Sequence, residues 1–483
     1  RGRVDLTEGA DRINNAGTFD AIGTSLFGGG ADIFANSGTT RSVNGAAVLT
    51  GVDTFNNSGL VAMNDGASGD RLTIGGSFAG LAGSRLALDV DFTAGTADVL
   101  ATNLATGTTV IEASVIGQAQ AGFASAGILL VDAGAGTQAG AFTLAGSSAT
   151  SNAYVTSGLF FDAANFDFLL VNTPNQPVFE TAVFGEMFAE LWHRSADAIA
   201  AQLDASRDGQ SGGSAGSIER GRLGGWVQLV GAERERVALQ TFGTTVFDVT
   251  YEQNFEGIQA GFDHQSGPLL FGVSFGVGQS EAQFEASLNR LEMQTRNLGA
   301  YVQFQSGSFF LNALAKADWI EAETDPGPGL GSSFDATAIG VRASGGFRFA
   351  LGGLWAEPAV SLSWTRIDVS DITSGGARIT FDDVTSLRGA AGLRVGGEFS
   401  VGAGTLAPFV GVHAIQELGE PGGNDFTFGS TLRLDQEDPG TFGQASLGLT
   451  YRAGMLEAFV RGEYDFGGNV DGRGARAGVR LRF

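Results

Sequence analysis

One five-residue motif in the chain has the form of a serine-hydrolase nucleophile. The segment Gly272–Gly276 matches G-x-S-x-G, a pattern that presents a reactive serine at a sharp turn between a strand and a helix. Around Ser274, however, apolar and small residues alternate as they do in an uninterrupted strand, with Val273, Phe275 and Val277 on one face. Because the required turn is missing, we interpret Ser274 as a small residue on the opposite face and expect no esterase activity.

The sequence also shows no convincing metal-binding motif. The three histidines, His193, His264 and His413, have no carboxylate or second histidine at metal-ligand spacing. The segment Gly28–Asp32 could begin a calcium-binding nonapeptide, but Phe27 breaks the required glycine pattern. We therefore expect neither a metal nor another cofactor. A net charge of -24 with only 28 Lys and Arg also argues against nucleic acid as a partner, because phosphate binding needs clustered cations.

The first 60 residues repeat with a period of 21, which is the signature of a solenoid whose stacked rungs bury one core. The repeated positions are Asp11, Asp32 and Asp53; Ile13, Phe34 and Phe55; Asn15, Asn36 and Asn57; and Gly17, Gly38 and Gly59. We expect the apolar positions to stack inside and the Asn and Gly positions to form rung corners with positive φ. Short alternating runs follow to Val171, such as Arg85–Phe92, and we expect this Asn-poor region to cap the solenoid.

Residues 178–207 break the β pattern with one amphipathic helix. Its apolar residues recur at steps of three and four: Phe184, Phe188, Leu191, Trp192, Ile199 and Leu203. A helix of about 30 residues reaches ~45 Å, enough to cross a bilayer inside a pore. The Gly/Ser-rich stretch 208–217 then marks a boundary.

The last 260 residues form a regular series of strands separated alternately by short turns and longer loops. Five short turns lie near 265–268, 305–308, 351–353, 402–404 and 452–454. Longer polar loops lie near 232–253, 282–289, 321–332, 369–383, 416–440 and 467–472. Together they connect 12 strands, and the alternation of short turns with long loops is typical of outer-membrane barrels.

The strands alternate in the sense that a membrane barrel requires. In the final strand Ala475, Ala477, Val479, Leu481 and Phe483 share one face, while Arg476, Arg480 and Arg482 share the other. An arginine on the lipid face would cost ~2–4 kcal/mol at mid-bilayer, so the arginines are expected in the lumen. No run of roughly 18 apolar residues exists, so a membrane-spanning form of this chain must be a closed barrel. Residue 1 is Arg and no signal peptide is recognisable, so we expect a fragment or a mature form.

Two segments carry a family resemblance. Gly224–Gly231, which contains Trp226 at the expected barrel start, and the closing Gly478–Phe483 resemble the autotransporter β-domain of type V secretion. The region from Leu72 to Val171 resembles a pertactin-like C-terminal passenger region. The resemblance implies that Val479, Leu481 and Phe483 form a signal for the barrel-assembly machinery, with outer-membrane lipid and periplasmic chaperones as further partners. It also implies that the helix, through Phe184, Phe188, Leu191, Trp192 and Ile199, lies in the barrel lumen.

The predicted fold is all-β: the end of a right-handed parallel β-helix, joined by one α-helix to a 12-stranded antiparallel transmembrane β-barrel. The predicted parts are rungs at 1–70, a cap or autochaperone-like region at 71–175, a linker with the lumen helix at 176–217, and the barrel at 218–483. The predicted function is passenger translocation and surface anchoring in the outer membrane, with an adhesin-like passenger that binds host or cell-surface ligands.

Two alternatives stay open from the sequence. One is an outer-membrane pore or channel with a periplasmic β-rich domain. The other is self-cleavage inside the barrel, which some members of the resembling family perform at paired Asn residues. The segment 179–206 contains no Asn, so an uncleaved, non-enzymatic anchor is the prediction.

Overall fold

The computed structural model describes residues 2–117, 122–146, 153–208, 222–325, 331–419, 422–436 and 438–483. The chain forms two compact units, Arg1–Asn175 with Thr427–Leu432, and Gln176–Phe426 with Arg433–Phe483. Each unit is considered separately below.

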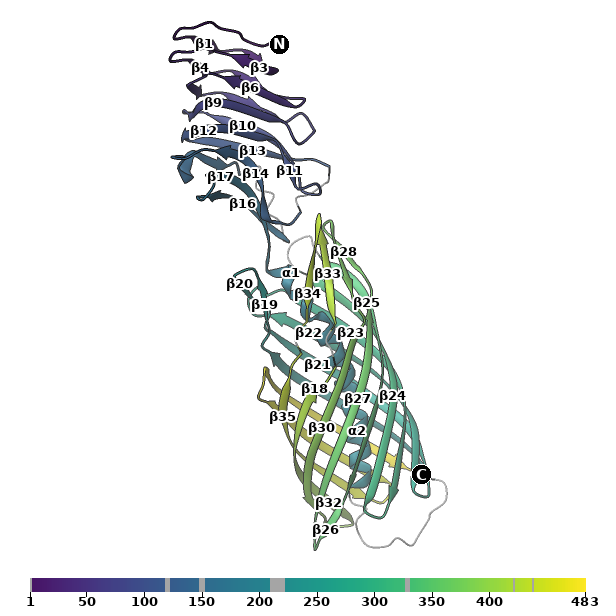
Figure 1. Ribbon diagram of the computed structural model, residues 1–483. Helices are drawn as coiled ribbons and strands as arrows, with labels where there is room; N and C mark the ends of the chain where they lie inside the picture. The colour runs from purple at the N-terminus through teal and green to yellow at the C-terminus, as the bar shows by residue number, and fades with distance from the viewer. Residues whose placement is uncertain are drawn as a thin grey trace. The chain divides into compact units, whose positions relative to one another are not determined.

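The first unit is a β-solenoid built from two sheets (Figure 1). One sheet contains β1 (Arg12–Asn15), β4 (Ile33–Asn36), β7 (Thr54–Asn57), β9 (Arg71–Gly80), β12 (Val99–Gly107), β14 (Ala124–Ala133), β17 (Asp167–Pro174) and β16 (Val155–Asp162), with β3 (Gly23–Leu26) and β6 (Ala46–Thr50) beside them. The other contains β15 (Phe142–Leu144), β13 (Thr109–Val115), β10 (Arg85–Asp91), β8 (Leu60–Ala62), β5 (Thr39–Arg41) and β2 (Thr18–Asp20), with β11 (Thr96–Ala97). A short 3₁₀ turn spans Ala139–Ala141.

The 21-residue period places equivalent residues directly above one another. β1, β4 and β7 pair in parallel, with Ile13 opposite Phe34 and Phe34 opposite Phe55. The rings of Phe34 and Phe55 stack at 4.9 Å, and Phe55 stacks on Phe78 at 5.6 Å. At the rung corners the amide of Asn15 donates to Asn36, 2.8 Å away. These ladders join successive rungs through side chains as well as backbone.

The glycine prediction needs a correction. Gly17, Gly38 and Gly59 do not have positive φ, and neither do the three repeated asparagines. A Cβ at Gly38 would instead overlap the carbonyl oxygen of Gly17, and one at Gly59 would overlap that of Gly38. Glycine is required there because adjacent rungs approach too closely for a side chain.

The parallel pairing ends at the last strands of the solenoid. β14 pairs with β17 in antiparallel fashion, and β17 forms an antiparallel hairpin with β16. Phe168 of β17 packs edge-on against Phe142, with ring centroids 4.9 Å apart, and Phe161 of β16 lies 4.9 Å from Phe168. The hairpin therefore carries aromatic side chains that cover this end of the apolar core.

The second unit begins with the helical segment. α1 (Gln176–Glu180) and a 3₁₀ turn (Thr181–Val183) precede α2 (Phe184–Arg207). The prediction of one continuous helix over 178–207 is therefore corrected: the regular helix has 24 residues and measures about 36 Å. None of the described helices is both long and apolar enough to span a membrane.

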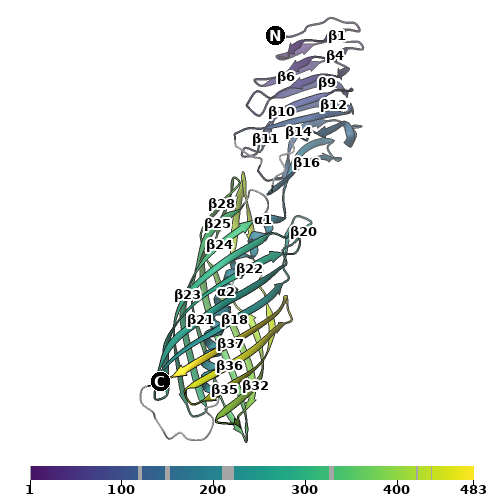
Figure 2. The ribbon, with the colours of Figure 1, turned by 180° about the vertical axis from the view of Figure 1, so that it is seen from behind.

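Twelve antiparallel strands surround α2 (Figures 1 and 2). They are β18 (Arg222–Arg236), β21 (Tyr251–Ser266), β22 (Leu269–Phe284), β23 (Arg290–Ser306), β24 (Phe309–Asp325), β25 (Ser332–Phe347), β27 (Leu354–Val369), β30 (Val384–Gly397), β32 (Gly404–Glu417), β35 (Thr441–Ala453), β36 (Leu456–Phe466) and β37 (Val470–Arg482). Short strands β26 (Phe349–Leu351) and β31 (Phe399–Val401) extend two of the turns. Pairing of β18 with β37 closes the barrel, so the predicted fold class is confirmed.

The outward face of the wall is apolar, as a lipid-facing surface requires. Val479 and Leu481 of β37 are exposed, as are Val273, Phe275 and Val277 of β22. The inward residues of the same strands are buried, including Arg476, Arg480 and Ser274. The two-residue alternation thus separates lipid-facing from lumen-facing side chains.

The connections differ in part from the predicted loops. The short turns lie as expected, but β18 and β22 run on to Arg236 and Phe284, and the last connection spans only 467–469. The first loop holds a hairpin, β19 (Leu239–Phe242) with β20 (Thr245–Asp248). Two further loops form a small sheet from β28 (Ile372–Ser374), β29 (Ala377–Phe381), β33 (Gly423–Phe428) and β34 (Ser430–Asp435). Polar residues at strand ends do not mark loops here, because strands projecting into water can be polar on their outer face.

Candidate functional site

Helix α2 is buried on all sides, which is unusual for a helix with so many charges. The residues predicted to lie in the lumen, Phe184, Phe188, Leu191, Trp192 and Ile199, are at most 3% exposed. The helix lies against β21, β22, β24, β25, β27 and β30 inside the barrel (Figure 2). The lumen containing α2 is therefore the candidate functional site.

Aromatic packing surrounds the first turns of α2. The ring of Phe184 lies 6.4 Å from Phe284, 6.3 Å from Phe334 and 6.4 Å from Phe381, all from the wall or its loops. Phe188 meets Phe334 edge-on at 6.1 Å. The predicted apolar stripe thus contacts the barrel where the helix enters it.

Deeper in the lumen a tryptophan fits over a glycine. A Cβ at Gly340 of β25 would lie 2.5 Å from Cζ2 of Trp192. The Trp192 indole N–H also donates to the carbonyl oxygen of Lys316, 3.5 Å away. The missing side chain at Gly340 is what lets the helix approach this wall.

Acidic residues on α2 face arginines on the wall. Nε of Arg236 donates to Glu186 at 3.0 and 3.1 Å, and Arg234 pairs with Glu190. These four side chains are at most 7% exposed. Lower on the helix, Asp197 pairs with Arg342 and Asp204 pairs with Arg461. Each of these four carboxylates therefore has a cationic partner, which offsets the cost of removing it from water.

The C-terminal end of α2 is held by arginines. Arg348 donates to the carbonyl oxygen of Arg207 at 3.0 Å, and Arg452 donates to that of Ser206 at 3.2 Å. Arg348 and Arg394 also contact Asp208, at 2.7 and 2.8 Å. Cations here satisfy the unpaired helix carbonyls and complement the negative end of the helix dipole.

A small cavity lies between the helix and the wall. It measures about 100 Å³ and is lined by charged residues of the helix and of strands on one side of the barrel. Its polar lining makes it suited to water. The helix thus occupies the lumen, with a small polar cavity beside it.

The serine-hydrolase pattern has no catalytic geometry. Ser274 lies inside β22, and its buried hydroxyl has no hydrogen-bond partner within the described residues. A different serine, Ser386, does contact a histidine: its Oγ lies 2.9 Å from Nε2 of His193. Ser386 itself donates to Glu417, at 2.9 and 3.0 Å. The serine stands between histidine and carboxylate, whereas a triad needs the histidine in the middle.

A second serine cluster escaped the sequence analysis because its members come from two distant segments. Nζ of Lys316 lies 2.6 Å from Oγ of Ser195, and Ser195 also lies 3.1 Å from Asp318. Lys316 and Asp318 form an ion pair of 2.5 Å with both side chains fully buried. Nζ of Lys316 donates to Ser195, and Ser195 donates to Asp318, so the cluster joins the helix to the wall.

The remaining predicted residues occupy the two faces of the wall. Val479, Leu481 and Phe483 are exposed on the outer face, where lipid lies. Trp226 points inward and is 4% exposed. Among the described residues no group of three potential metal ligands was found.

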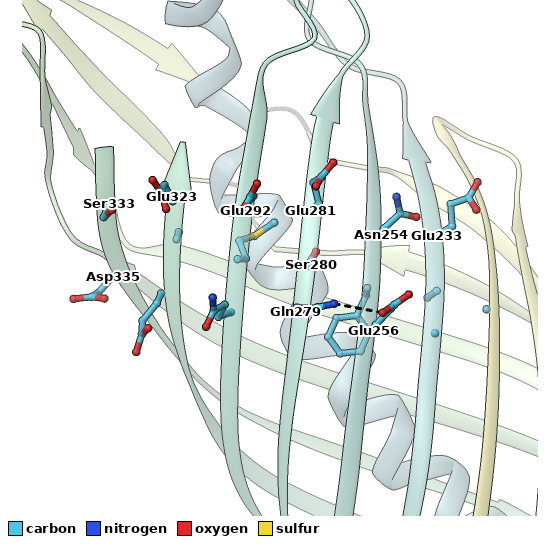
Figure 3. A pocket seen from close by; sticks show the side chains of 18 of the residues that line it. Glu233, Asn254, Glu256, Gln279, Ser280, Glu281, Glu292, Glu323, Ser333 and Asp335 are labelled. Carbon is cyan, nitrogen blue, oxygen red and sulfur yellow. Dashed lines mark hydrogen bonds between the residues drawn. The ribbon is translucent and has the colours of Figure 1, made fainter. Parts of the chain in front are cut away.

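A hollow of about 1230 Å³ lies over strands β18, β21–β25 and β37. Figure 3 shows its carboxylates along the strands, with α2 behind them. Its acidic residues are Glu233, Glu256, Glu281, Glu292, Glu321, Glu323 and Asp335. They occupy the outward positions of strand ends that the sequence analysis had assigned partly to loops.

Comparison with known proteins identifies the barrel. The family model described as "Autotransporter beta-domain" matches residues 225–465. No curated protein sequence matches the chain.

Three solved structures match part of this chain at low identity. The beta domain of the Bordetella autotransporter Brka is 18% identical, with TM-score 0.44, over 54% of this chain and 99% of that one. The translocator domain of NalP from Neisseria meningitidis is 17% identical, with TM-score 0.46, over 64% and 100%. The transport unit of AIDA-I from Escherichia coli is 14% identical, with TM-score 0.45, over 58% and 97%.

The family match runs from β18 to β36 of the barrel described above. The chain therefore belongs to the bacterial autotransporters, with an outer-membrane translocator β-domain as its C-terminal part.

Proposed function

We propose that the barrel exports the solenoid to the cell surface and then holds it there through α2. The observation that carries this proposal is the burial of α2 inside the barrel, with Glu186 and Glu190 ion-paired to Arg236 and Arg234. Pulling the helix out would expose its apolar side and separate these buried charges, so the helix serves as an anchor.

The parts of the chain have separate roles in this proposal. Residues 1–70 are passenger rungs, 71–175 form the cap, 176–217 form the linker with the lumen helix, and 218–483 form the barrel. The end of the linker, 209–217, lies outside the described residues. The passenger is proposed to be adhesin-like and to bind host or cell-surface ligands, because stacked rungs present long, regular faces.

Stacking of rungs outside the cell supplies a driving force for export. The cap would leave the barrel first, and its folded core would resist return of the chain. Leu130 is fully buried in that core. Leu130→Asp should therefore reduce surface display strongly, whereas unchanged display and folding of this variant would contradict the proposal.

Assembly needs partners beyond lipid. The exposed residues Val479, Leu481 and Phe483 of the last strand are proposed to be read by the barrel-assembly machinery, after periplasmic chaperones have carried the unfolded chain. Substituting the three residues with Ser should lower the amount of folded barrel in the outer membrane, whereas an unchanged amount would argue against this signal.

The channel alternative is disfavoured because α2 occupies the lumen and leaves a cavity of about 100 Å³. The segment is also proposed to have no enzymatic activity, self-cleavage included, since neither buried serine cluster places a histidine between the serine and a carboxylate as a triad requires. Mass spectrometry of the barrel from cells tests this: an intact linkage between α2 and β17 is expected.

Protease shaving of intact cells tests the main proposal. Peptides from residues 1–170 should disappear while barrel peptides survive, because the solenoid lies outside and the barrel is embedded in lipid. If solenoid peptides persist until the outer membrane is breached, the domain is periplasmic and the export proposal fails.

A further inference from the structure

Closing a barrel requires its first and last strands to pair, although they lie farthest apart along the chain. Here β18 and β37 form this seam, from Gly224 opposite Arg482 to Arg236 opposite Val470. The strands next to them are joined by hairpin connections, β36 to β37 and β18 to β21. The seam has no connection of its own, so interactions across it decide whether the barrel stays closed.

A buried ion pair crosses the whole of β18 and not only the boundary between β18 and β37. Arg480 of β37 pairs with Asp263 of β21, and their side chains are 3% and 2% exposed. Because β18 lies between these two strands, the pair joins the last strand to the second strand across the first. Two other arginines of β37 pair with the neighbouring β36: Arg476 reaches Glu463 at 2.7 Å and Arg482 reaches Glu457 at 2.6 Å. Arg473 does cross the seam to Glu233 of β18, but its side chain is 74% exposed.

Gly224 makes this crossing possible. It lies on β18 beneath the ion pair, and a Cβ there would lie 2.6 Å from Oδ1 of Asp263 and 3.1 Å from Nε of Arg480. No side chain fits under the two charged groups without moving them. Glycine is therefore needed at position 224, near the start of the barrel, because Arg480 near the end of the chain must cross above it.

Asp263 is also fixed from its other side. The Tyr301 hydroxyl of β23 donates to its Oδ2 at 3.2 Å, and the Trp226 indole N–H of β18 donates to the Tyr301 oxygen at 2.7 Å. These side chains again cross strands over glycines, since a Cβ at Gly272 would lie 2.5 Å from the Tyr301 ring. The network thus connects β37, β18, β21 and β23 on the lumen side.

We propose that Arg480, Asp263, Tyr301 and Trp226, crossing over Gly224, form a seam latch that keeps the barrel closed. Parting β18 from β37 would break the backbone ladder and also leave Arg480 and Asp263 unpaired in a buried setting. The latch concerns closure of the wall and is independent of whether the solenoid is exported.

Amide hydrogen exchange of the full chain in detergent micelles tests the latch. The variant Asp263→Asn/Arg480→Gln removes both charges, so neither is left unpaired. Its exchange should become at least tenfold faster in residues 224–236 and 470–482, with β22 to β24 unchanged. The matched control Glu463→Gln/Arg476→Gln removes a buried pair of the same last strand and should not accelerate β18. Unchanged exchange in β18, or equal acceleration of all strands, would overturn the proposal.

A seam disulfide provides a second measurement. The chain has no Cys, and the directly opposed, exposed Val227 and Val479 can be replaced by Cys. Oxidation should return the latch variant to the heat resistance of the parent on denaturing gels and should not rescue the control variant. Rescue of both or of neither would contradict the latch. If the latch variant does not assemble, Gly224→Ala can be used instead, because it disturbs the ion pair without removing it. The disulfide between positions 227 and 479 should restore its heat resistance as well.

Discussion

Nε of Arg236 on the barrel wall donates to both carboxylate oxygens of Glu186 on α2, at 3.0 and 3.1 Å. Both side chains are buried. The contact connects the first strand of the barrel with the first turn of the helix. The wall holds the helix through several contacts of this kind, in which a carboxylate on α2 pairs with an arginine on the wall.

Glu186→Ala should destabilise the barrel by about 3–5 kcal/mol, because it leaves the Arg236 guanidinium buried without its carboxylate. Thermal unfolding of the purified chain measures this loss. Glu233→Ala is the control, since Glu233 pairs with the 74% exposed Arg473 and such surface pairs contribute about 1 kcal/mol or less. Equal losses for the two variants would refute the anchoring role of Glu186.

Phe55→Ala should weaken the solenoid by about 3–5 kcal/mol, because Phe55 is fully buried between Phe34 and Phe78. Protease resistance of the neighbouring rungs should fall, while that of the barrel stays constant. Ile22→Ala serves as control, since Ile22 is 42% exposed and its removal should change resistance little. A solenoid that tolerates Phe55→Ala would show that the ring stack does not stabilise it.

Gly478→Ala should lower barrel stability by about 1–3 kcal/mol through overpacking. A Cβ at Gly478 would lie 2.5 Å from the Phe459 ring, whereas one at Gly462 on the adjacent strand meets its first atom at 3.9 Å. Gly462→Ala should therefore be nearly neutral. The heat-dependent shift of the folded band on gels compares the two, and the account fails if their order is reversed.

The solenoid should be less stable at neutral pH than in mild acid. Burial raises the pKa of Asp98 to about 6, although its oxygens accept the backbone N–H groups of Asp70 and Asp89. The folded state therefore binds more protons than the unfolded state between pH 3.8 and about 6, and stability falls as pH rises through that window.

Amide exchange in β9 to β12, measured from pH 4 to 7 and corrected for intrinsic rates, checks this sign. Asp98→Asn should flatten the trend, and the exposed Asp65→Asn should preserve it. If the pH dependence of exchange persists in the Asp98→Asn variant, a group other than Asp98 causes it.

Much of the fold could be predicted from the sequence because period and alternation report directly on which face is buried. The 21-residue spacing of Ile13, Phe34 and Phe55 predicted stacked rungs, and the alternation around Val479 predicted the direction of lipid. The helix was predicted from its apolar stripe, but its break at Thr181–Val183 was not, since those residues have no helix-breaking signal.

The site itself was less predictable, because its contacts join segments far apart in the chain. Ser195 with Lys316, and Asp263 with Arg480, depend on barrel register, which the sequence alone does not give. The role of Gly38 was misjudged for a related reason: its requirement arises from the adjacent rung and not from its own φ.

Surface labelling of single cysteines is the most direct test of the account, because the chain has no Cys. Cysteine would replace the exposed Ala67 in the solenoid, Thr244 in a loop at the helix entry, or Ser308 in a short turn at the other end. In intact cells a membrane-impermeant maleimide should label positions 67 and 244, and it should label position 308 only after the outer membrane is permeabilised. Protection of position 67 in intact cells, with 244 labelled, would contradict export of the solenoid.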